Sequence, residues 1–430
     1  MRITTLNDQS KKKILNDLLK RSSNNLGAYE ETVKKIIDSV REYGDKAVFS
    51  YTKEFDDFLL TPKNILVTKE EILEAYSLVD DDFIRIMKQA AENIRVFHEK
   101  QMHTSWFDSK EDGTILGQKM TAIEHVGVYV PGGKAAYPSS TLMNIIPAKV
   151  AGVNNIIMTT PPNKDGKINA GTLVAADIAG ANKIYKVGGA QAIAALAFGT
   201  ESIPKVHKIV GPGNIFVALA KKAVYGYVSI DSIAGPSEIL VLADESANPK
   251  YIAADLLSQA EHDELASAIC ITTSMDLAKK ISEEVDAFLP TLDRNQIIQK
   301  SLDAYGHILF VNSLEEGIAL ANEIASEHLE LFVSNPFEVM AKIKNAGAIF
   351  LGEYSSEPLG DYFAGPNHVL PTNGTAKFFS PLNVDDFRKK TSIIYYTKEA
   401  LENVHKDIEL FAKKEGLSAH ANSIQVRFES

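Results

Sequence analysis

Gln259 and His262 are residues whose types and spacing could do chemistry. They stand three apart at the end of an apolar-periodic run, 251–258, so both side chains point the same way from one predicted helix. An amide oxygen and an imidazole nitrogen that converge there would form half of a zinc site, because zinc accepts both donor types. On spacing alone, the pattern favours a solvated or helix-capping histidine.

Glu327 and His328 form a second candidate pair, placed where a predicted strand begins. Adjacent glutamate and histidine side chains can divide acid–base work, since one can take a proton from a hydroxyl and the other from water. A surface ion pair explains the same two residues, and without other information it is the simpler interpretation.

Further polar groups lie in irregular segments near the C-terminus. Asp361 and His368 belong to a loop rich in glycine and proline, and long irregular loops are often functional. Glu415 precedes the glycine stop of a predicted helix. Four residues together would supply the two nitrogen and two oxygen donors of an open zinc site: Gln259, His262, Asp361 and His420. Their separation in sequence leaves open whether they meet.

Composition limits the classes of protein to consider. The 430 residues, 45% hydrophobic and 23% charged, predict a soluble globular chain of two or more domains. A net charge of −11 argues against nucleic acid or an anionic membrane as partner. Without a signal peptide or an apolar span, we expect a cytoplasmic protein. The single cysteine, Cys270, lies in an apolar predicted strand and is expected to be inert packing.

The elements that must position these residues alternate between strand and helix. A helical region that includes an amphipathic segment at 80–102 comes first, and a loop-rich stretch after Pro371 leads to a final helix at 398–414. Strand–turn–helix alternation between them predicts parallel doubly wound sheets. The predicted strands are His125–Val130, Asn155–Thr159, Lys183–Val187, Lys208–Val210, Glu238–Leu242, Ser267–Thr272, His307–Val311, Leu329–Val333 and Ala348–Leu351.

Three glycine turns follow strands of the first block, at 131–133, 188–189 and 211–214. Ligands bind such sheets at the carboxyl ends of the strands, so the turns favour a ligand with phosphates or an extended polar shape. The last turn is only the front half of a dinucleotide fingerprint, because Phe216 stands where the third glycine would be. Tight turns without a ligand remain an alternative for each one.

Long motifs in a fixed order make the chain resemble the histidinol dehydrogenase family over nearly its whole length, although the first 25 residues resemble it only loosely. The motifs are Gly127-Val128-Tyr129-Val130-Pro131-Gly132-Gly133, Val187-Gly188-Gly189-Ala190-Gln191-Ala192-Ile193-Ala194, Ile209-Val210-Gly211-Pro212-Gly213-Asn214, Ala234-Gly235-Pro236-Ser237-Glu238, Leu257-Ser258-Gln259-Ala260-Glu261-His262, Asn367-His368-Val369-Leu370-Pro371-Thr372 and Ala419-His420.

The resemblance implies a homodimeric enzyme with one Zn²⁺ per subunit that oxidises L-histidinol to L-histidine with two NAD, the last step of histidine biosynthesis. It implies Gln259, His262, Asp361 and the neighbouring subunit's His420 as zinc ligands, all four also touching substrate. The residues that match the family's NAD contacts are Tyr129, Gln191 and Asn214. Those that match its substrate contacts are Ser237, His328, His368 and Glu415. Its acid–base pair corresponds to Glu327 and His328.

The expected fold is α/β, with two doubly wound, incomplete Rossmann-like sheet domains, a helical N-terminal segment and a small C-terminal tail. The expected division is 1–24 as the N-terminal segment, 25–128 with 235–382 as the first α/β domain, 129–234 as the second, and 383–430 as a tail that crosses to the partner subunit.

The reaction itself requires two bases, because an alcohol must lose its proton and water must add to an aldehyde. We assign the first task to His328 and the second to Glu327, with zinc orienting the substrate. Cys270, in its apolar strand, is poorly placed to hold the aldehyde covalently. Without the family match, a zinc hydrolase and a nucleotide-binding module without chemistry are the alternatives.

Overall fold

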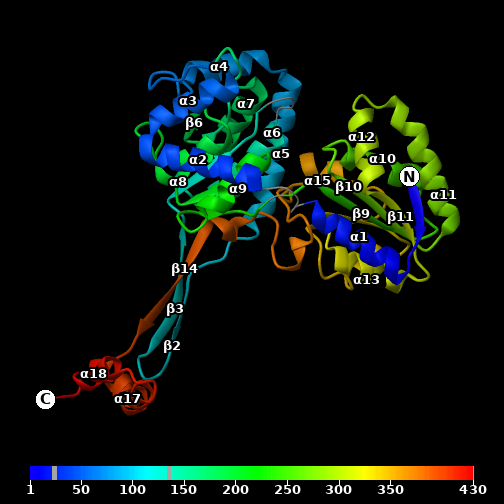
Figure 1. Cartoon of the computed structure of the whole chain (residues 1–430). Coiled ribbons are helices and arrows are strands. Elements are labelled where there is room, and N and C mark those ends of the chain that lie inside the picture. The colour runs from blue at the N-terminus through cyan, green and yellow to red at the C-terminus, as the bar shows by residue number, and fades with distance from the viewer. Residues whose placement is uncertain (22–26, 133–136, 234, 430) are drawn as a thin grey trace. The chain divides into compact units, whose positions relative to one another are not determined.

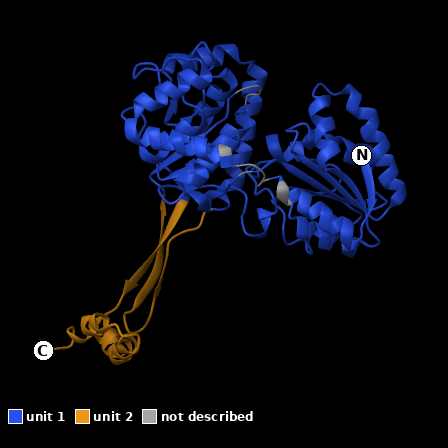
Figure 2. Cartoon of the chain, in the orientation of Figure 1, with its two compact units in different colours: residues 1–101, 123–387 blue, residues 102–122, 388–430 orange. Residues whose placement is uncertain are grey.

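The computed structural model describes residues 1–21, 27–132, 137–233 and 235–429. Its contacts divide the chain into unit 1, Met1–Gln101 with Ile123–Phe387, and unit 2, Met102–Ala122 with Arg388–Ser430 (Figure 2). Gly133, Ala234 and the sequence-based boundaries at 24/25 and 234/235 fall on or beside residues outside the described part. The domain boundaries expected from the sequence stay predictions.

One parallel six-stranded sheet of unit 1 has the order β1-β11-β10-β9-β12-β13. Its strands are β1 (Arg2–Thr5), β9 (Glu238–Ala243), β10 (Ser267–Thr272), β11 (Gly306–Phe310), β12 (His328–Phe332) and β13 (Ala348–Leu351). The helices of this half are α1 (Asp8–Lys20), α10 (Pro249–Ala260), α11 (Met275–Phe288), α12 (Asn295–Tyr305), α13 (Leu314–Ile324), α14 (Pro336–Met340) and α15 (Glu357–Tyr362).

Helices cover this sheet on both faces because its strand residues are apolar on both faces. Ile239, Val241 and Cys270 pack with α10 and α11, whereas the alternate residues Leu240 and Leu242 pack with α1 and α13 (Figure 1). Cys270 is fully buried, and burial raises the pKa of its thiol, so the prediction of inert packing is confirmed.

The second sheet of unit 1 is parallel, with the order β6-β5-β4-β7-β8. Its strands are β4 (His125–Tyr129), β5 (Asn155–Thr159), β6 (Lys183–Tyr185), β7 (Lys208–Val210) and β8 (Ser229–Ile230). The helices between them are α6 (Pro138–Val150), α7 (Ala170–Ala179), α8 (Gly189–Phe198) and α9 (Ile215–Val224). With the two parallel sheets, the predicted α/β fold class is confirmed.

Four earlier helices pack on this second half: α2 (Gly27–Tyr43), α3 (Asp45–Asp56), α4 (Lys69–Leu78) and α5 (Asp81–Glu99). Helix α2 contacts α8 and α9, α4 contacts α7, and α5 contacts α6. In these contacts the apolar faces of α2 and α3 are buried against α8 and α9.

Unit 2 contains an antiparallel sheet of order β14-β3-β2 and three helices. Its elements are β2 (Trp106–Ser109), β3 (Ile115–Ala122), β14 (Arg388–Tyr395), α16 (Lys398–Glu402), α17 (His405–Lys414) and α18 (Ser418–Gln425). The prediction of a single helix at 398–414 is wrong, because two non-helical residues separate α16 from α17. The strands β2, β3 and β14 were also missed, since their residues are mostly exposed or half-buried and show little alternation.

The predicted helix at 80–102 is confirmed as α5, and Asp80 caps its first turn. All nine predicted strands have counterparts, with ends that differ by a few residues. Within the described ranges, no helix is both long enough and apolar enough to cross a membrane.

Candidate active site

Gln259 lies in the last turn of α10, and His262 follows two residues after the helix ends. Asn248 caps the helix, Pro249 starts it, and Ile252 and Leu256 bury its apolar face. Gln259 is fully buried, and its amide oxygen and nitrogen have no hydrogen-bond partner among the described residues. A buried amide without partners is costly, so this side chain is suited to a ligand. The partial negative charge of the helix end favours a cation there.

Glu327 and His328 lie at the beginning of β12 and are both buried. The Nδ1–H of His328 donates to the main-chain carbonyl of Glu238 at 3.0 Å, which leaves Nε2 as the atom that can exchange a proton. Oε2 of Glu327 accepts from the Glu238 N–H at 2.9 Å. The adjacent pair is therefore a buried, oriented one, and the alternative of a surface ion pair is wrong.

Asp361, in α15, faces two histidines. Its Oδ1 lies 3.6 Å from His328 Nε2 and 3.9 Å from His368 Nδ1. Burial would raise the pKa of Asp361, but His328, His368 and His262 outweigh it and lower the pKa to about 2. Burial would lower the pKa of His328, but the carboxylates of Glu327 and Asp361 raise it to about 10. Burial raises the pKa of Glu327 to about 8, opposed by His328.

A candidate cation site lies between α10 and α15. Ligand atoms of His262, Glu357 and Asp361 all lie within 4.8 Å of one another. Although the His262 side chain is 44% exposed, burial among these groups lowers its pKa, which favours the neutral imidazole that metals bind. Together with the partnerless amide of Gln259, this donor set fits zinc.

Glu357 is a site residue that the sequence analysis missed. It is buried, accepts from the Ser258 hydroxyl at 2.8 Å and lies 3.9 Å from His262 Nε2. Burial, with Asp361 next in importance, raises its pKa to about 7. The signal was present in the sequence, because Glu357 stands four residues before Asp361 and therefore shares one face of the helix.

His368 connects the site to the other half of unit 1. Its Nδ1–H donates to the main-chain carbonyl of Asp361 at 3.0 Å, and its Nε2 lies 3.3 Å from the Ser140 hydroxyl of α6. The preceding Asn367 donates to the Met143 carbonyl of the same helix at 2.7 Å. The loop is thus fixed between the two halves, as expected for a functional loop.

These groups gather at the amino ends of strands of the first sheet. Ser237 immediately precedes β9, His328 begins β12, and the end of α10 lies ahead of β10. They therefore lie at the amino edge of their sheet, whereas the glycine turns of the other sheet lie at its carboxyl edge. The reason is local: helices that return to a parallel sheet end at its amino edge and bring their negative ends there.

The three predicted NAD contacts follow strands of the second sheet at its carboxyl ends. The Tyr129 hydroxyl accepts from the Gly189 N–H at 3.2 Å, and burial raises its pKa to about 12. Gln191 is 1% exposed, and neither amide atom has a partner within the described chain. The Asn214 side-chain oxygen caps α9 by accepting hydrogen bonds from the N–H groups of Phe216 and Val217. This oxygen is therefore already used within the protein.

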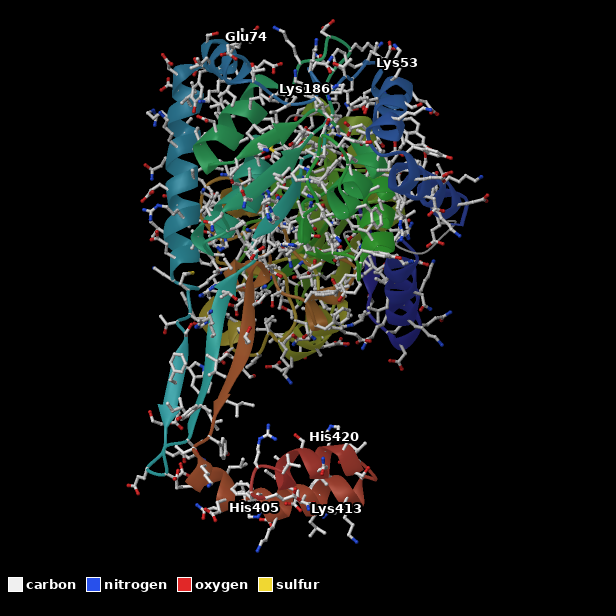
Figure 3. The ribbon with its side chains drawn as sticks, turned by 90° about the vertical axis from the view of Figure 1, so that its left-hand side faces the viewer. Lys53, Glu74, Lys186, His405, Lys413 and His420 are labelled. Atoms are coloured by element: carbon white, nitrogen blue, oxygen red, sulfur yellow. The ribbon has the colours of Figure 1, made fainter. Side chains whose placement is uncertain are left out.

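Glu415 and His420 belong to unit 2. Glu415 is the C-cap of α17, and His420 lies exposed on α18, which packs against α17 (Figure 3). Their part in the site stays a prediction.

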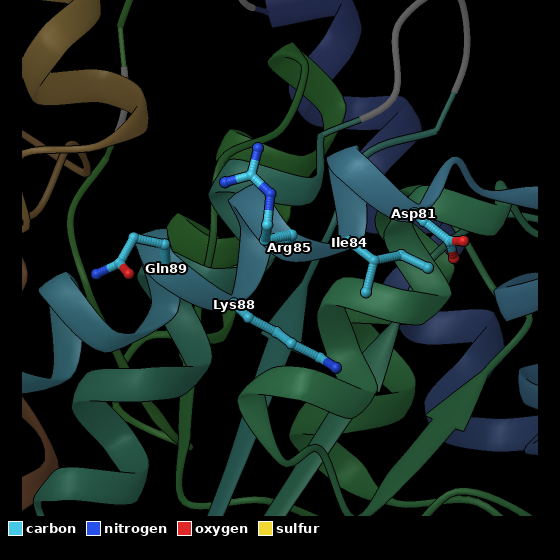
Figure 4. A pocket seen from close by; sticks show the side chains of 5 residues that line it. All are labelled: Asp81, Ile84, Arg85, Lys88 and Gln89. Carbon is cyan, nitrogen blue, oxygen red and sulfur yellow. The ribbon is translucent and has the colours of Figure 1, made fainter.

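A surface cavity of about 470 Å³ lies on α5, lined by Asp81, Ile84, Arg85, Lys88 and Gln89 (Figure 4). None of these is a predicted site residue, and all but Ile84 are exposed. A shallow site on one exposed helix face lacks the convergent buried polar groups found around Asp361.

Comparison with known proteins places this geometry in a family. A family model described as histidinol dehydrogenase matches residues 19–428. The chain belongs to the histidinol dehydrogenase family. It is 61% identical over 399 residues to the histidinol dehydrogenase of Clostridium acetobutylicum, a match that covers 93% of this chain and 92% of that relative. For the histidinol dehydrogenase of Halalkalibacterium halodurans, identity is 57% over 430 residues, covering 100% and 99%.

The crystal structure of histidinol dehydrogenase from Elizabethkingia anophelis has a TM-score of 0.93 to this chain at 38% identity, covering 99% of this chain and 98% of that one. The histidinol dehydrogenase match extends through both units, so the segment that carries Glu415 and His420 is part of the family's chain.

Proposed function

We propose that the chain oxidises L-histidinol to L-histidine through the aldehyde, with two NAD reduced, as the last step of histidine biosynthesis. Family membership supports the substrate. The observation that carries the mechanism is the buried pair Glu327 and His328, whose hydrogen bonds to Glu238 leave one reactive atom on each side chain.

The proposed zinc ligands are Gln259, His262 and Asp361, with His420 from the partner subunit of a cytoplasmic homodimer. The partnerless buried amide of Gln259 and the convergence of His262 and Asp361 support this set. When bound, zinc would orient the substrate and offset the Asp361 charge that raises the pKa of His328. Ser237, His368 and Glu415 would contact the substrate.

His328 Nε2 takes the hydroxyl proton as the first hydride leaves the alcohol carbon, because Nδ1 already donates to Glu238. Oε1 of Glu327, the oxygen not bonded to the Glu238 N–H, then takes a proton from water, which adds to the aldehyde. His328 Nε2 releases the alcohol proton to solvent and then takes the hydroxyl proton of the hydrate as the second hydride leaves. The balance is one alcohol, one water and two NAD converted to one carboxylate, two NADH and three protons.

NAD accepts both hydrides, one in each oxidation. Its proposed contacts are Tyr129, Gln191 and Asn214, at the carboxyl ends of β4, β6 and β7. The two unused amide atoms of Gln191 support this, because they would otherwise be buried without partners.

The test is to supply histidinol and NAD to purified protein and to count NADH formed per histidine. We expect a ratio of two. A ratio of one, or no NADH, would contradict the four-electron proposal, and a zinc hydrolase would form none. A parallel reaction without histidinol measures the background.

A further inference from the structure

Arg21 is a buried cation that no predicted role explains. It caps the C-terminal end of α1, and its side chain is fully buried in an ion pair with Glu238. The guanidinium also donates to the Leu265 carbonyl at 3.0 Å and lies 5.5 Å from the centre of the Tyr305 ring. A planar guanidinium that uses several donors at once is held in one orientation.

Glu238, the partner of Arg21, contacts both members of the acid–base pair. Its N–H donates to Oε2 of Glu327 at 2.9 Å, and its carbonyl accepts from Nδ1 of His328 at 3.0 Å. Its own Oε2 accepts from the Glu327 N–H at 3.3 Å. Three hydrogen bonds therefore run from this one residue to Glu327 and His328, and the remaining carboxylate oxygen is held by Arg21.

We propose that Arg21 and Glu238 are a positioning pair that holds Glu327 and His328 in their reactive orientation, which makes the N-terminal segment part of the active site. The inference rests on the proposed function for the roles of Glu327 and His328. Arg21 fixes the Glu238 carboxylate, which holds the Glu327 main chain, and the Glu238 main chain holds both reactive side chains. Arg21 also offsets a negative charge that would otherwise lie beside the Glu327 carboxylate.

The Arg21–Glu238 pair differs from the buried lysine pair Lys208–Asp386 in what it touches. Lys208 is 4% exposed and forms an ion pair with Asp386 at 3.4 Å. Neither member of this ion pair is Glu327 or His328. Lys208→Met therefore removes a buried cation without the proposed positioning effect, and it serves as the matched control for Arg21→Met.

The experiment compares Arg21→Met, Arg21→Lys, the double variant Arg21→Met/Glu238→Gln and Lys208→Met in the full-length enzyme. Each is measured for thermal unfolding, for kcat and KM with histidinol, and for deuterium exchange at the Glu327 amide. In Arg21→Met, we expect kcat to fall about 10- to 100-fold, the range for misplaced catalytic groups, with KM within about twofold. Exchange at Glu327 should accelerate. Arg21→Lys should have a kcat between those of Arg21→Met and the wild type. It keeps the positive charge but loses the planar guanidinium that donates in several fixed directions.

The double variant separates positioning from stability. It contains no unpaired buried charge, so thermal stability should return toward the wild type, whereas kcat should stay low. Recovery of kcat together with stability would overturn the proposal, as would an Arg21→Met variant whose kcat and Glu327 exchange match those of Lys208→Met. If Arg21→Met fails to fold, kcat and Glu327 amide exchange in the double variant and in Arg21→Lys test the proposal instead. If the wild-type protein does not oxidise histidinol, the proposed function is wrong. Deuterium exchange at the Glu327 amide would still test whether Arg21 and Glu238 hold Glu327 in place.

Discussion

At the scale of single residues, Glu327 has an environment that ties its charge to pH. Burial raises its pKa to about 8, so the carboxylate form that can act as a base is favoured only above that pH. The rate of aldehyde oxidation should therefore rise with pH through about pH 8 as the Glu327 carboxyl loses its proton. The measurement is the pH profile of NADH formation from the aldehyde.

Glu327→Gln should remove this rise and slow the aldehyde step much more than the first hydride transfer. A profile that is flat between about pH 6 and pH 9 in the unmodified enzyme, or equal slowing of both steps in the variant, would remove Glu327 from the proposed role.

Asp56 carries an uncompensated buried charge. One carboxylate oxygen is buried without a partner in the described chain, and burial raises the pKa of Asp56 to about 6. Because the folded pKa exceeds the unfolded value near 3.9, the protonated form is favoured by folding, and stability falls as pH rises from about 4 to about 6. After allowance for solvent screening of this partly exposed group, Asp56→Asn should stabilise the fold by about 1 to 2 kcal/mol at pH 8.

Unfolding temperatures of Asp56→Asn and the wild type, measured at pH 4 and pH 8, check this prediction. The difference should be small at pH 4 and appear at pH 8. Asp293→Asn, which changes an exposed carboxylate, is the control. An Asp56→Asn variant that is less stable than wild type at pH 8 would show that the carboxylate has a partner.

At the scale of elements, the strands and helices of the two sheets follow from hydrophobic pattern and glycine turns, because buried parallel strands are continuous apolar runs. The strand β1 was missed because four residues, Arg2–Thr5, carry too little pattern and are fixed by pairing with β11. The site is harder to predict. Gln259 and His262 give a local signal, but their convergence with Asp361 depends on contacts between segments about 100 residues apart. Arg21 gives no local signal of its position beside the site, and Glu238 appears only as the last residue of the motif at 234–238.

The end of α10 is the element on which zinc binding depends. Gln259→Ala and Asp361→Ala should each lower zinc affinity by more than the roughly 10- to 100-fold typical of losing an outer partner, whereas Glu357→Gln should stay within that range. Zinc bound per chain, measured after chelation and re-addition of the metal, checks this without an activity assay. His405→Ala changes a half-buried histidine of α17 that is outside the proposed ligand set, and it is the control. Unchanged zinc content in Gln259→Ala would exclude that amide as a ligand.

At the scale of the whole molecule, the proposed crossing of His420 to a partner has a direct test. His420→Ala subunits and Glu327→Gln subunits should each be inactive alone. A mixed dimer contains one site with an intact Glu327 and an intact partner's tail, so mixing should restore activity. For random exchange of equal amounts, about a quarter of wild-type activity is expected from the statistics of closed dimers.

No recovery despite demonstrated exchange of subunits would place the tail in its own subunit's site. Mixing two batches of Glu327→Gln protein is the control, and it should restore nothing.

The burial of the only cysteine has a practical consequence for this experiment. Since Cys270 is fully enclosed in β10 and its thiol resists ionisation, it should not react with maleimides while the protein is folded. An exposed serine such as Ser423 on α18 could be exchanged for cysteine and would then be the single reactive thiol of the chain. Two batches labelled there with a donor and an acceptor dye would report subunit exchange by energy transfer, with the native sequence otherwise intact.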